Sequence, residues 1–390
     1  MKGAGEPVSA AVEKLLAAGG ASWYRGQGRE CFNLARGVYE PVAKAEGIAR
    51  VADFRASHGV IKKNPGASLV DLGDGVACLE LHSKKNAIGE DIVRLVTDTL
   101  RPDSDAVRNF LAFVISGDTD NFSVGANLMQ LLLSIQEGEW DDVDLAIRAF
   151  QRMTASIKFC PRPVVAAPFG FCFGGGAEIA LHSARRQPHA ELYMGLVETG
   201  VGLLPGGGGC KEMTLHAVDS AASVREGGRS ESVELLEALR KNFETVAMAK
   251  VSTSAAEARR FGFLSPSDQV TMNRERLLVD AKDVAWEMAH AGYAAPLQRT
   301  DIPAPGQNLL ATLKLGVHVM REGDYISDHD VKVANWVAYV LCGGNITPGT
   351  PVSEQYLLDL EREAFLSLCG EKKTQERIAF TLKTGKPLRN

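Results

Sequence analysis

The feature that most constrains the fold is an alternation of strand-like and helix-like segments that begins near residue 66. The first segment, SLVDLGDGVACLELHS, alternates apolar and polar residues on both sides of Asp74-Gly75 and therefore predicts a β-hairpin. Four further segments indicate helix, buried strand, helix and strand in turn: DIVRLVTDTL, FLAFVIS, DVDLAIRAFQRMTASI and PVVAAP. Strands and helices that alternate over short links are typical of an α/β domain.

Two polar stretches that contain Pro and Gly, KKNPGAS and TDIPAPGQN, divide the chain. Segments such as SAAVEKLLAAG and RVADFRASHG before the first stretch indicate short helices, and helical apolar spacing returns after the second. A charged stretch at 221–241 is interpreted as a solvated surface insertion. The expected parts are a helical appendage at 1–62, an α/β domain at 66–298 and a helical C-terminal domain at 309–390.

The composition favours a protein that acts on small molecules. The formal net charge of −5 argues against a nucleic-acid-binding surface, which needs clustered basic residues. The sequence contains no run of about 18 apolar residues, the length that spans a bilayer. The seven cysteines are widely spaced without a C-x-x-C pair, which is typical of reduced, mostly buried thiols. We expect a cytoplasmic protein without a nucleic-acid or membrane partner.

Two glycine-rich stretches invite a nucleotide-binding interpretation, but their spacing does not fit it. In ETGVGLLPGGGGCKEM, Pro205 follows Gly200 and Gly202 at the position where a dinucleotide site needs its third glycine. Lys211 lacks the neighbouring glycine and hydroxyl residue of a phosphate-binding loop. The histidines form no H-E-x-x-H motif. We therefore expect no NAD, ATP or metal site, and no cofactor.

Three consecutive glycines, Gly174–Gly176, stand between the strand PVVAAP and a helix that opens at Ala177 and Glu178. The first amides of a helix lack partners within the helix, and the helix dipole makes this end positive. Glycines let a carbonyl oxygen approach these amides closely, which would form half of an oxyanion hole. The alternative is a tight connection between strand and helix that serves packing alone.

Two further stretches carry related signals. In DNFSVGANLMQLL a loop turns at Gly125 into a helix, so backbone amides again lie at a helix start, although Asn127 is equally a simple N-cap. In HAELYMGLVETGVG, Glu198 lies in an otherwise apolar loop, where a carboxylate is costly unless it has a partner or a task. Each signal alone is also explained by local structure.

Together these three stretches resemble the enoyl-CoA hydratase/isomerase (crotonase) family over roughly residues 66–290. The resemblance implies an α/β, crotonase-like fold of repeated ββα units with helical N-terminal and C-terminal extensions. NFSVGANL and GGGAE match the motifs that supply the family's two oxyanion-hole amides, which here would come from Ala126 and Gly175. Glu178 and Glu198 keep the twenty-residue spacing of the two catalytic glutamates in the family's hydratases.

The resemblance extends to the segment that lines bound coenzyme A (CoA), which SKKNAIG matches with its Asn-Ala pair. The residues that it implies for binding the CoA thioester are Asn86, Ala87, Gly125, Asn127, Leu128 and Gly174. Asn127 stands where the family usually has Asp, a change that preserves the capping oxygen. The stretch at 221–241 follows the active-site glycines and would reshape the acyl end of the pocket.

The flanks resemble bifunctional proteins in which a 3-hydroxyacyl-CoA dehydrogenase precedes a crotonase domain, here without the NAD-binding half. The resemblance as a whole implies an enoyl-CoA hydratase of fatty-acid β-oxidation, which adds water to a trans-2-enoyl-CoA to give a 3-hydroxyacyl-CoA. The alternatives are a Δ3-Δ2-enoyl-CoA isomerase, a non-catalytic CoA-ester-binding remnant and a 3-hydroxyacyl-CoA dehydrogenase subunit completed by another chain. The implied partners are the acyl-CoA substrate and a dehydrogenase or thiolase polypeptide, and a homo-oligomer is left open.

Overall fold

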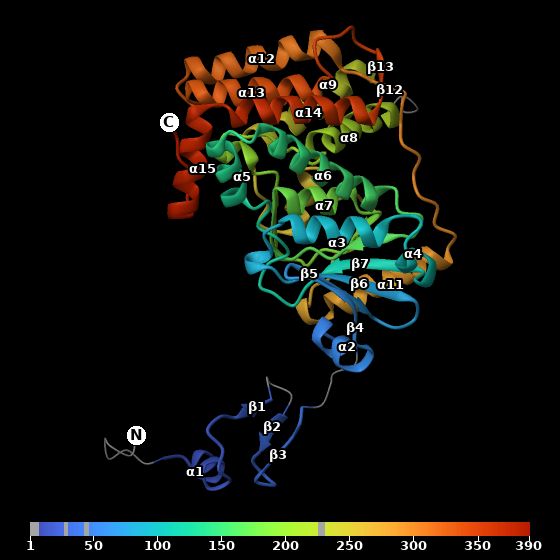
Figure 1. Ribbon diagram of the computed structural model, residues 1–390, viewed down its shortest axis with the longest axis vertical. Helices are drawn as coiled ribbons and strands as arrows, with labels where there is room; N and C mark the ends of the chain where they lie inside the picture. The colour runs from blue at the N-terminus through green and yellow to red at the C-terminus, as the bar shows by residue number, and fades with distance from the viewer. Residues whose placement is uncertain (1–7, 27–29, 43–46, 225–230) are drawn as a thin grey trace. The chain divides into compact units, whose positions relative to one another are not determined.

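The computed structural model describes residues 8–26, 30–42, 47–224 and 231–390 and divides the chain into two compact units, Met1–Ile48 and Ala49–Asn390 (Figure 1). The first unit contains one helix and a three-stranded antiparallel sheet in the order β1-β2-β3. These elements are α1 (Ala10–Ala17), β1 (Tyr24–Arg25), β2 (Glu30–Asn33) and β3 (Val38–Pro41).

The prediction of a helical appendage at 1–62 is wrong for the part from β1 to β3. Phe32 is buried on one face of this sheet, and its ring packs against Trp23 and Tyr39 with ring-centroid distances of 6.2 and 5.3 Å. The Asn33 side chain accepts two backbone hydrogen bonds in the turn between β2 and β3. Aromatic packing across short strands therefore decides the structure here, and helix propensity does not.

The second unit starts at Ala49, so the boundary between the units precedes the predicted one near residue 62. After α2 (Val51–His58) comes the main sheet of this unit, in the order β10-β8-β7-β6-β5-β4. Its strands are β4 (Val60–Lys63), β5 (Ala67–Asp71), β6 (Val76–Leu81), β7 (Ala112–Ser116), β8 (Val164–Ala166) and β10 (Arg185–Arg186). β5 and β6 form the predicted hairpin around Asp74-Gly75, and β6, β7, β8 and β10 run parallel.

Helices cover both faces of this sheet, as an α/β domain requires. Figure 1 shows α3 (Glu90–Leu100) on one side of the sheet and α11 (Leu277–His290) on the other, where α11 packs on β6, β7 and β8. Every residue of β6 and β7 is therefore buried. The connections carry η1 (Lys84–Asn86), α4 (Asp105–Asn109), α5 (Leu128–Glu137), α6 (Trp140–Lys158), α10 (Ala255–Arg260) and η4 (Arg274–Arg276).

A second, two-stranded sheet brings two distant loops together. β9 (Gly170–Phe173) and β11 (Leu192–Gly195) pair in parallel, so their carboxyl ends lie at the same edge. Helix α7 (Gly175–His182) follows β9, and the 3₁₀ helix η2 (Glu198–Val201) follows β11. The three glycines and Glu198 therefore lie at one edge of this sheet.

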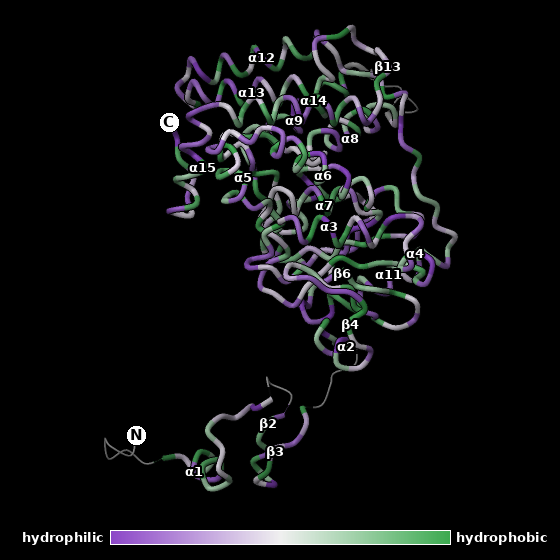
Figure 2. The backbone as a smooth tube through the Cα atoms, viewed as in Figure 1, coloured by the Kyte–Doolittle hydropathy of each residue, from purple (hydrophilic) through white to green (hydrophobic). Residues whose placement is uncertain are grey.

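The helices predicted at 309–390 are present, but they belong to the second unit and not to a separate domain. They are α12 (Gly306–Glu322), α13 (Asp328–Leu341), α14 (Glu354–Cys369) and α15 (Lys372–Thr384). Buried residues such as Val337 and Leu368 join the same hydrophobic core as the strands. Hydrophobic and hydrophilic residues alternate along α12 and α13 (Figure 2), as expected for helices with one packed face. The TDIPAPGQN stretch contains β12 (Ile302–Pro303), which pairs with β13 (Pro351–Val352).

The charged stretch at 221–241 contributes to two packed helices, α8 (Gly209–Val224) and α9 (Glu231–Ala247). Ala221 and Leu239 are buried, so the interpretation of this stretch as a solvated surface insertion is wrong at both of its ends. Residues 225–230 lie outside the described residues. The seven cysteines are free thiols and all but Cys31 are buried, as the sequence predicts.

Candidate active site

At the start of α7, neighbouring atoms leave no room for a side chain at Gly174 or Gly176. Gly174 has a φ of +51°, which glycine adopts without strain, and its amide donates to the carbonyl of Gly195 at 2.9 Å. A Cβ atom on Gly174 would lie 2.8 Å from Oε1 of Glu198, and one on Gly176 would lie 2.7 Å from Cβ of Ser123. A larger residue would displace either the Glu198 carboxylate or the loop that carries Ser123.

That loop lies against the start of α7. Ser123 pairs with Cys172 of β9 in a parallel bridge, and its carbonyl accepts a hydrogen bond from the Phe173 amide at 2.9 Å. Gly125 has a φ of +94°, and a Cβ atom there would lie 3.5 Å from the amide nitrogen of Gly175. The structure therefore brings together the two loops that carry Ala126 and Gly175.

Within the described residues, the amides of Ala126 and Gly175 donate no hydrogen bond. Ala126 lies opposite Ile88, whose amide donates to Gly125 and whose carbonyl accepts from Asn127, at 2.8 and 3.1 Å. This parallel pairing turns the N–H group of Ala126 away from Ile88. Gly175 is the first residue of α7, so its N–H group has no acceptor within the helix.

Glu178 is held by the loop before α8. Its Oε1 atom accepts hydrogen bonds from the amides of Gly207 and Gly209 at 2.8 and 2.9 Å. The side chain is buried, and this desolvation raises the pKa of Glu178 to about 7 against the opposing effect of the two amides and of Lys211. A carboxylate with such a pKa can exchange a proton near neutral pH.

Glu198 faces the same site from η2. Its Oε2 atom is buried and has no hydrogen-bond partner among the residues that the structure describes. Burial, and then the charge of Glu178, raise the pKa of Glu198 well above the usual value. The pKa values of both carboxyl groups are therefore raised, and the two groups titrate as an interacting pair.

A third group at the site is the ring of Phe150 from α6, which sequence reasoning missed. A Cβ atom on Gly175 would lie 2.6 Å from Cζ of Phe150, and one on Gly207 would also collide with this ring. Phe150 therefore lies between the first residue of α7 and the loop that binds Glu178. The sequence offers little signal for this placement, because Phe150 occupies an ordinary apolar position of a helix.

The side chain of Asn86, a predicted CoA-binding residue, forms hydrogen bonds with the loop before Ala126. Its side chain is fully buried and donates hydrogen bonds to Oγ1 of Thr119 and to the carbonyls of Asn121 and Phe122, at 2.8 to 3.1 Å. Its φ of +52° belongs to the left-handed turn that directs this side chain inward. The Nδ2 group of Asn86 therefore connects η1 to the loop that leads to Ala126, while its buried Oδ1 atom has no hydrogen-bond partner among the described residues.

The other predicted binding residues flank the same loop. Asn127 caps α5, since its Oδ1 atom accepts a hydrogen bond from the Gln130 amide at 3.4 Å. Leu128 is the first residue of α5, and both Leu128 and Ala87 are half-buried. No contact with CoA follows from these positions alone.

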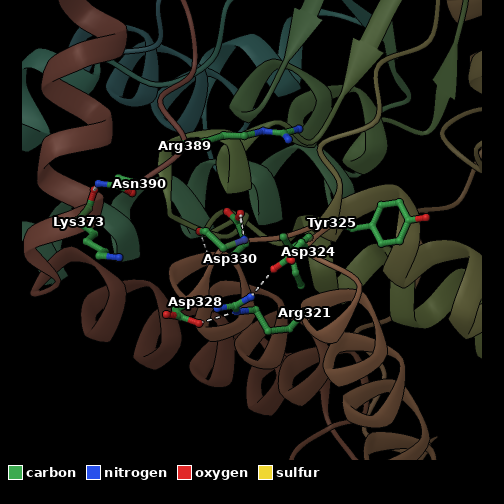
Figure 3. A pocket seen from close by; sticks show the side chains of 10 residues that line it. Arg321, Asp324, Tyr325, Asp328, Asp330, Lys373, Arg389 and Asn390 are labelled. Atoms are coloured by element: carbon green, nitrogen blue, oxygen red, sulfur yellow. Dashed lines mark hydrogen bonds and ion pairs between the residues drawn. The ribbon is translucent and has the colours of Figure 1, made fainter.

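Two cavities have linings that do not include the paired glutamates, and the smaller of the two is lined by Gln151, Thr154 and Lys211, beside the loop that binds Glu178. The larger, of about 350 Å³, is polar and lies beside the ends of α12, α13 and α15 (Figure 3). Figure 3 shows Arg321 between Asp324 and Asp328, with nitrogen–oxygen distances of 3.0 and 2.6 Å. Because Arg321 already pairs with two of the cavity's carboxylates, the cavity offers a cation little uncompensated charge.

Sequence reasoning also missed two buried glutamates of α14. The Lys158 and Lys211 ammonium groups both pair with Glu354 and with Glu212. Glu361 lies beside the loop that binds Glu178. A signal was available, because Glu354 and Glu361 share a helical stripe whose other members are apolar: Leu357, Ala364 and Leu368.

Within the described residues, no group of His, Cys, Asp and Glu side chains is arranged to hold a metal ion. No described helix has both the length and the apolar character that crossing a membrane requires.

Comparison with known proteins supports the fold, and a family model matches the segment that contains the candidate site. Residues 75–219 match the model of the family described as enoyl-CoA hydratase/isomerase. A Bacillus subtilis (strain 168) protein named "Probable 3-hydroxyacyl-CoA dehydrogenase" is 44% identical over 379 residues. This match covers 97% of the chain but 46% of the relative, so the chain spans about half the length of the curated relatives that it matches.

Solved structures give the same result for the fold. The chain resembles an enoyl-CoA hydratase of Bacillus halodurans with a TM-score of 0.51 and 15% identity, covering 80% of this chain and 99% of the other. It resembles an enoyl-CoA hydratase of Mycobacterium avium subsp. paratuberculosis K-10 with a TM-score of 0.50 and 17% identity, covering 83% and 98%. The predicted crotonase-like fold is therefore confirmed.

Proposed function

We propose that the chain binds a trans-2-enoyl-CoA and adds water across its double bond, because residues 75–219 match the model of the enoyl-CoA hydratase/isomerase family. The observation that carries this proposal is the pair of buried carboxyl groups, Glu178 and Glu198, beside two loops with unpaired amides. Hydration needs one group that accepts a proton from water and another that gives a proton to carbon.

In the proposed mechanism, the amides of Ala126 and Gly175 bind the thioester oxygen and stabilise the enolate charge that develops on it. Loss of one such donor typically costs about 10²- to 10³-fold in rate. Glu178 accepts a proton from the attacking water while the water oxygen bonds to C3. Glu198 donates a proton to C2, and the product is the 3-hydroxyacyl-CoA.

The different surroundings of the two carboxyl groups support this division of roles. Glu178 is bound by two backbone amides that stabilise its ionised form, so it is the better base of the pair. The Oε2 atom of Glu198 is buried without a partner, which favours the protonated form that an acid needs. A double-bond isomerase would need one of the two carboxylates, and the presence of both therefore favours hydration.

The experiment is an absorbance assay of crotonyl-CoA and longer enoyl-CoA thioesters with wild type, Glu178→Gln and Glu198→Gln. We expect each variant to lose about 10²- to 10⁴-fold in kcat, the usual contribution of a general acid or base, while CoA-ester binding persists. Glu287→Gln on the exposed surface of α11 is the matched control and should behave as wild type. Near-normal turnover of either active-site variant would exclude the mechanism.

The same assay separates the alternative functions. A Δ3-Δ2-enoyl-CoA isomerase would convert a 3-enoyl-CoA and leave the 2-enoyl-CoA unhydrated. A CoA-ester-binding remnant would bind thioesters without turnover. The name of the Bacillus subtilis relative suggests a third activity, and NAD-dependent oxidation of a 3-hydroxyacyl-CoA would identify a dehydrogenase contribution.

A further inference from the structure

The loop before α8 divides its amides between two buried carboxylates from different parts of the chain. The amides of Gly207 and Gly209 donate to Glu178 of α7 at 2.8 and 2.9 Å. The intervening amide of Gly208 donates to Oε2 of Glu361 at 2.8 Å, and the amide of Lys211 donates to its Oε1 atom. The two glutamates therefore accept hydrogen bonds from alternating amides at the amino-terminal end of α8.

Glu361 is an unusual residue for its position. It is fully buried on a stripe of α14 whose other members, apart from Glu354, are apolar, and unlike Glu354 it forms no ion pair with any described residue. Burial, and then the charge of Glu178, raise the pKa of Glu361 well above its usual value, against two amide hydrogen bonds. An apolar side chain would avoid this desolvation cost. The presence of a carboxyl group therefore indicates that its hydrogen bonds to the loop matter.

The loop is tightly enclosed, so a small shift of its backbone reaches Glu178. A Cβ atom on Gly207 would lie 2.7 Å from Oε2 of Glu178, and one on Gly209 would lie 3.0 Å from its Oε1 atom. The loop carbonyls are anchored separately on α6, by Gln151 at the carbonyl of Gly206 and by Thr154 at that of Gly207, at 2.9 and 2.7 Å. The loop therefore keeps two anchors when Glu361 is changed.

We propose that Glu361 is a positioning residue for Glu178. By holding the amides of Gly208 and Lys211, it fixes the loop whose neighbouring amides orient the Glu178 carboxylate. This inference rests on the proposed role of Glu178 in hydration. If Glu361 has this role, α14 contributes to the active site although it lies outside the matched segment at 75–219.

The test is Glu361→Gln, which keeps the shape of the side chain but offers one carbonyl oxygen to two amides. We expect kcat to fall about 10- to 100-fold, the cost of a misplaced catalytic group, with KM within about twofold of wild type. Hydrogen exchange at the amides of Gly207 and Gly209 should become faster. Should Glu361→Gln fail to fold, Glu361→Asp keeps the carboxyl group but shortens the side chain so that it cannot reach both amides, and the same readouts apply.

Two controls on the same helix separate positioning from stability. Glu363→Gln makes the identical chemical change at an exposed site and should leave kcat and exchange unchanged. Leu368→Ala removes buried apolar packing and should lower stability without lowering the kcat of the folded protein.

Unchanged kcat in Glu361→Gln, or an equal loss of kcat in Leu368→Ala, would overturn the inference. The exchange readout keeps it separate from the proposed function. If wild type does not hydrate enoyl-CoA, the proposed function is wrong. Faster exchange at Gly207 and Gly209 in Glu361→Gln would still support the inference that Glu361 holds the loop, and unchanged exchange would refute it.

Discussion

Replacement of Gly174 by alanine is the sharpest test of the site, because the added methyl group meets a proposed catalytic carboxylate and not the core. The new Cβ atom would lie 2.8 Å from Oε1 of Glu198 and 3.8 Å from Cα of Gly125. Ordinary contacts begin near 3.4 Å, so the carboxylate must withdraw by about 0.6 Å. The backbone also has to hold alanine at a φ of +51°.

The two effects have different magnitudes and different readouts. The left-handed conformation of Gly138 costs an L residue about 1–2 kcal/mol, which should appear as a lower free energy of unfolding. Gly174, with φ +51° and ψ −121°, lies outside that region, so alanine there should lower the free energy of unfolding by at least as much. A displacement of about 1 Å in a catalytic group costs up to about 10²-fold in rate, so we expect kcat to fall about 10- to 100-fold. Gly138→Ala separates the two, because Gly138 has a φ of +75° and its Cβ atom would meet nothing within 4 Å.

The measurement combines urea unfolding with initial rates of crotonyl-CoA hydration for both alanine variants. Gly138→Ala should lose stability and keep its kcat, whereas Gly174→Ala should lose at least as much stability and also lose kcat. If Gly174→Ala retains wild-type kcat, Glu198 does not need its observed position. If Gly138→Ala loses as much kcat as Gly174→Ala, general destabilisation explains the loss and the reasoning fails.

Three further predictions concern the pH dependence of rate, the pH dependence of stability and a hydrogen-bonded side chain. Because burial raises the pKa of Glu178 to about 7, the base is protonated below that pH, so a pH–rate profile should show kcat/KM rising as pH passes through about 7. The same raised pKa contributes stability that is present below the unfolded value near 4.5 and is lost as pH rises through 7, so the free energy of unfolding should decline over this window more steeply in wild type than in Glu178→Gln. Asn86→Ala removes the Nδ2 group, whose two hydrogens are shared among three acceptors in the loop before Ala126, and it should lower the free energy of unfolding by about 2–4 kcal/mol in urea titrations. A change below about 0.5 kcal/mol would show that this tie is dispensable.

Local signals in the sequence were sufficient to predict the alternation of strands and helices and the loops that form the candidate site. The hairpin around Asp74-Gly75 and the cap at Asn127 depend on residues within a few positions of one another, and both are found as expected. Short strands were the exception. The sheet of the first unit depends on the packing of Phe32 against Trp23 and Tyr39, which a helical pattern conceals.

The sequence by itself indicated the residues that we propose for catalysis, because the glycine motif and the spacing of Glu178 and Glu198 are local features of the chain. Only the tertiary structure decided what surrounds them. Phe150 and Glu361 reach the site from helices far away in sequence, and Asn86 turns inward to hold a loop. Burial depends on which segments pack together, so the raised pKa of Glu178 follows from the folded core and from no local pattern.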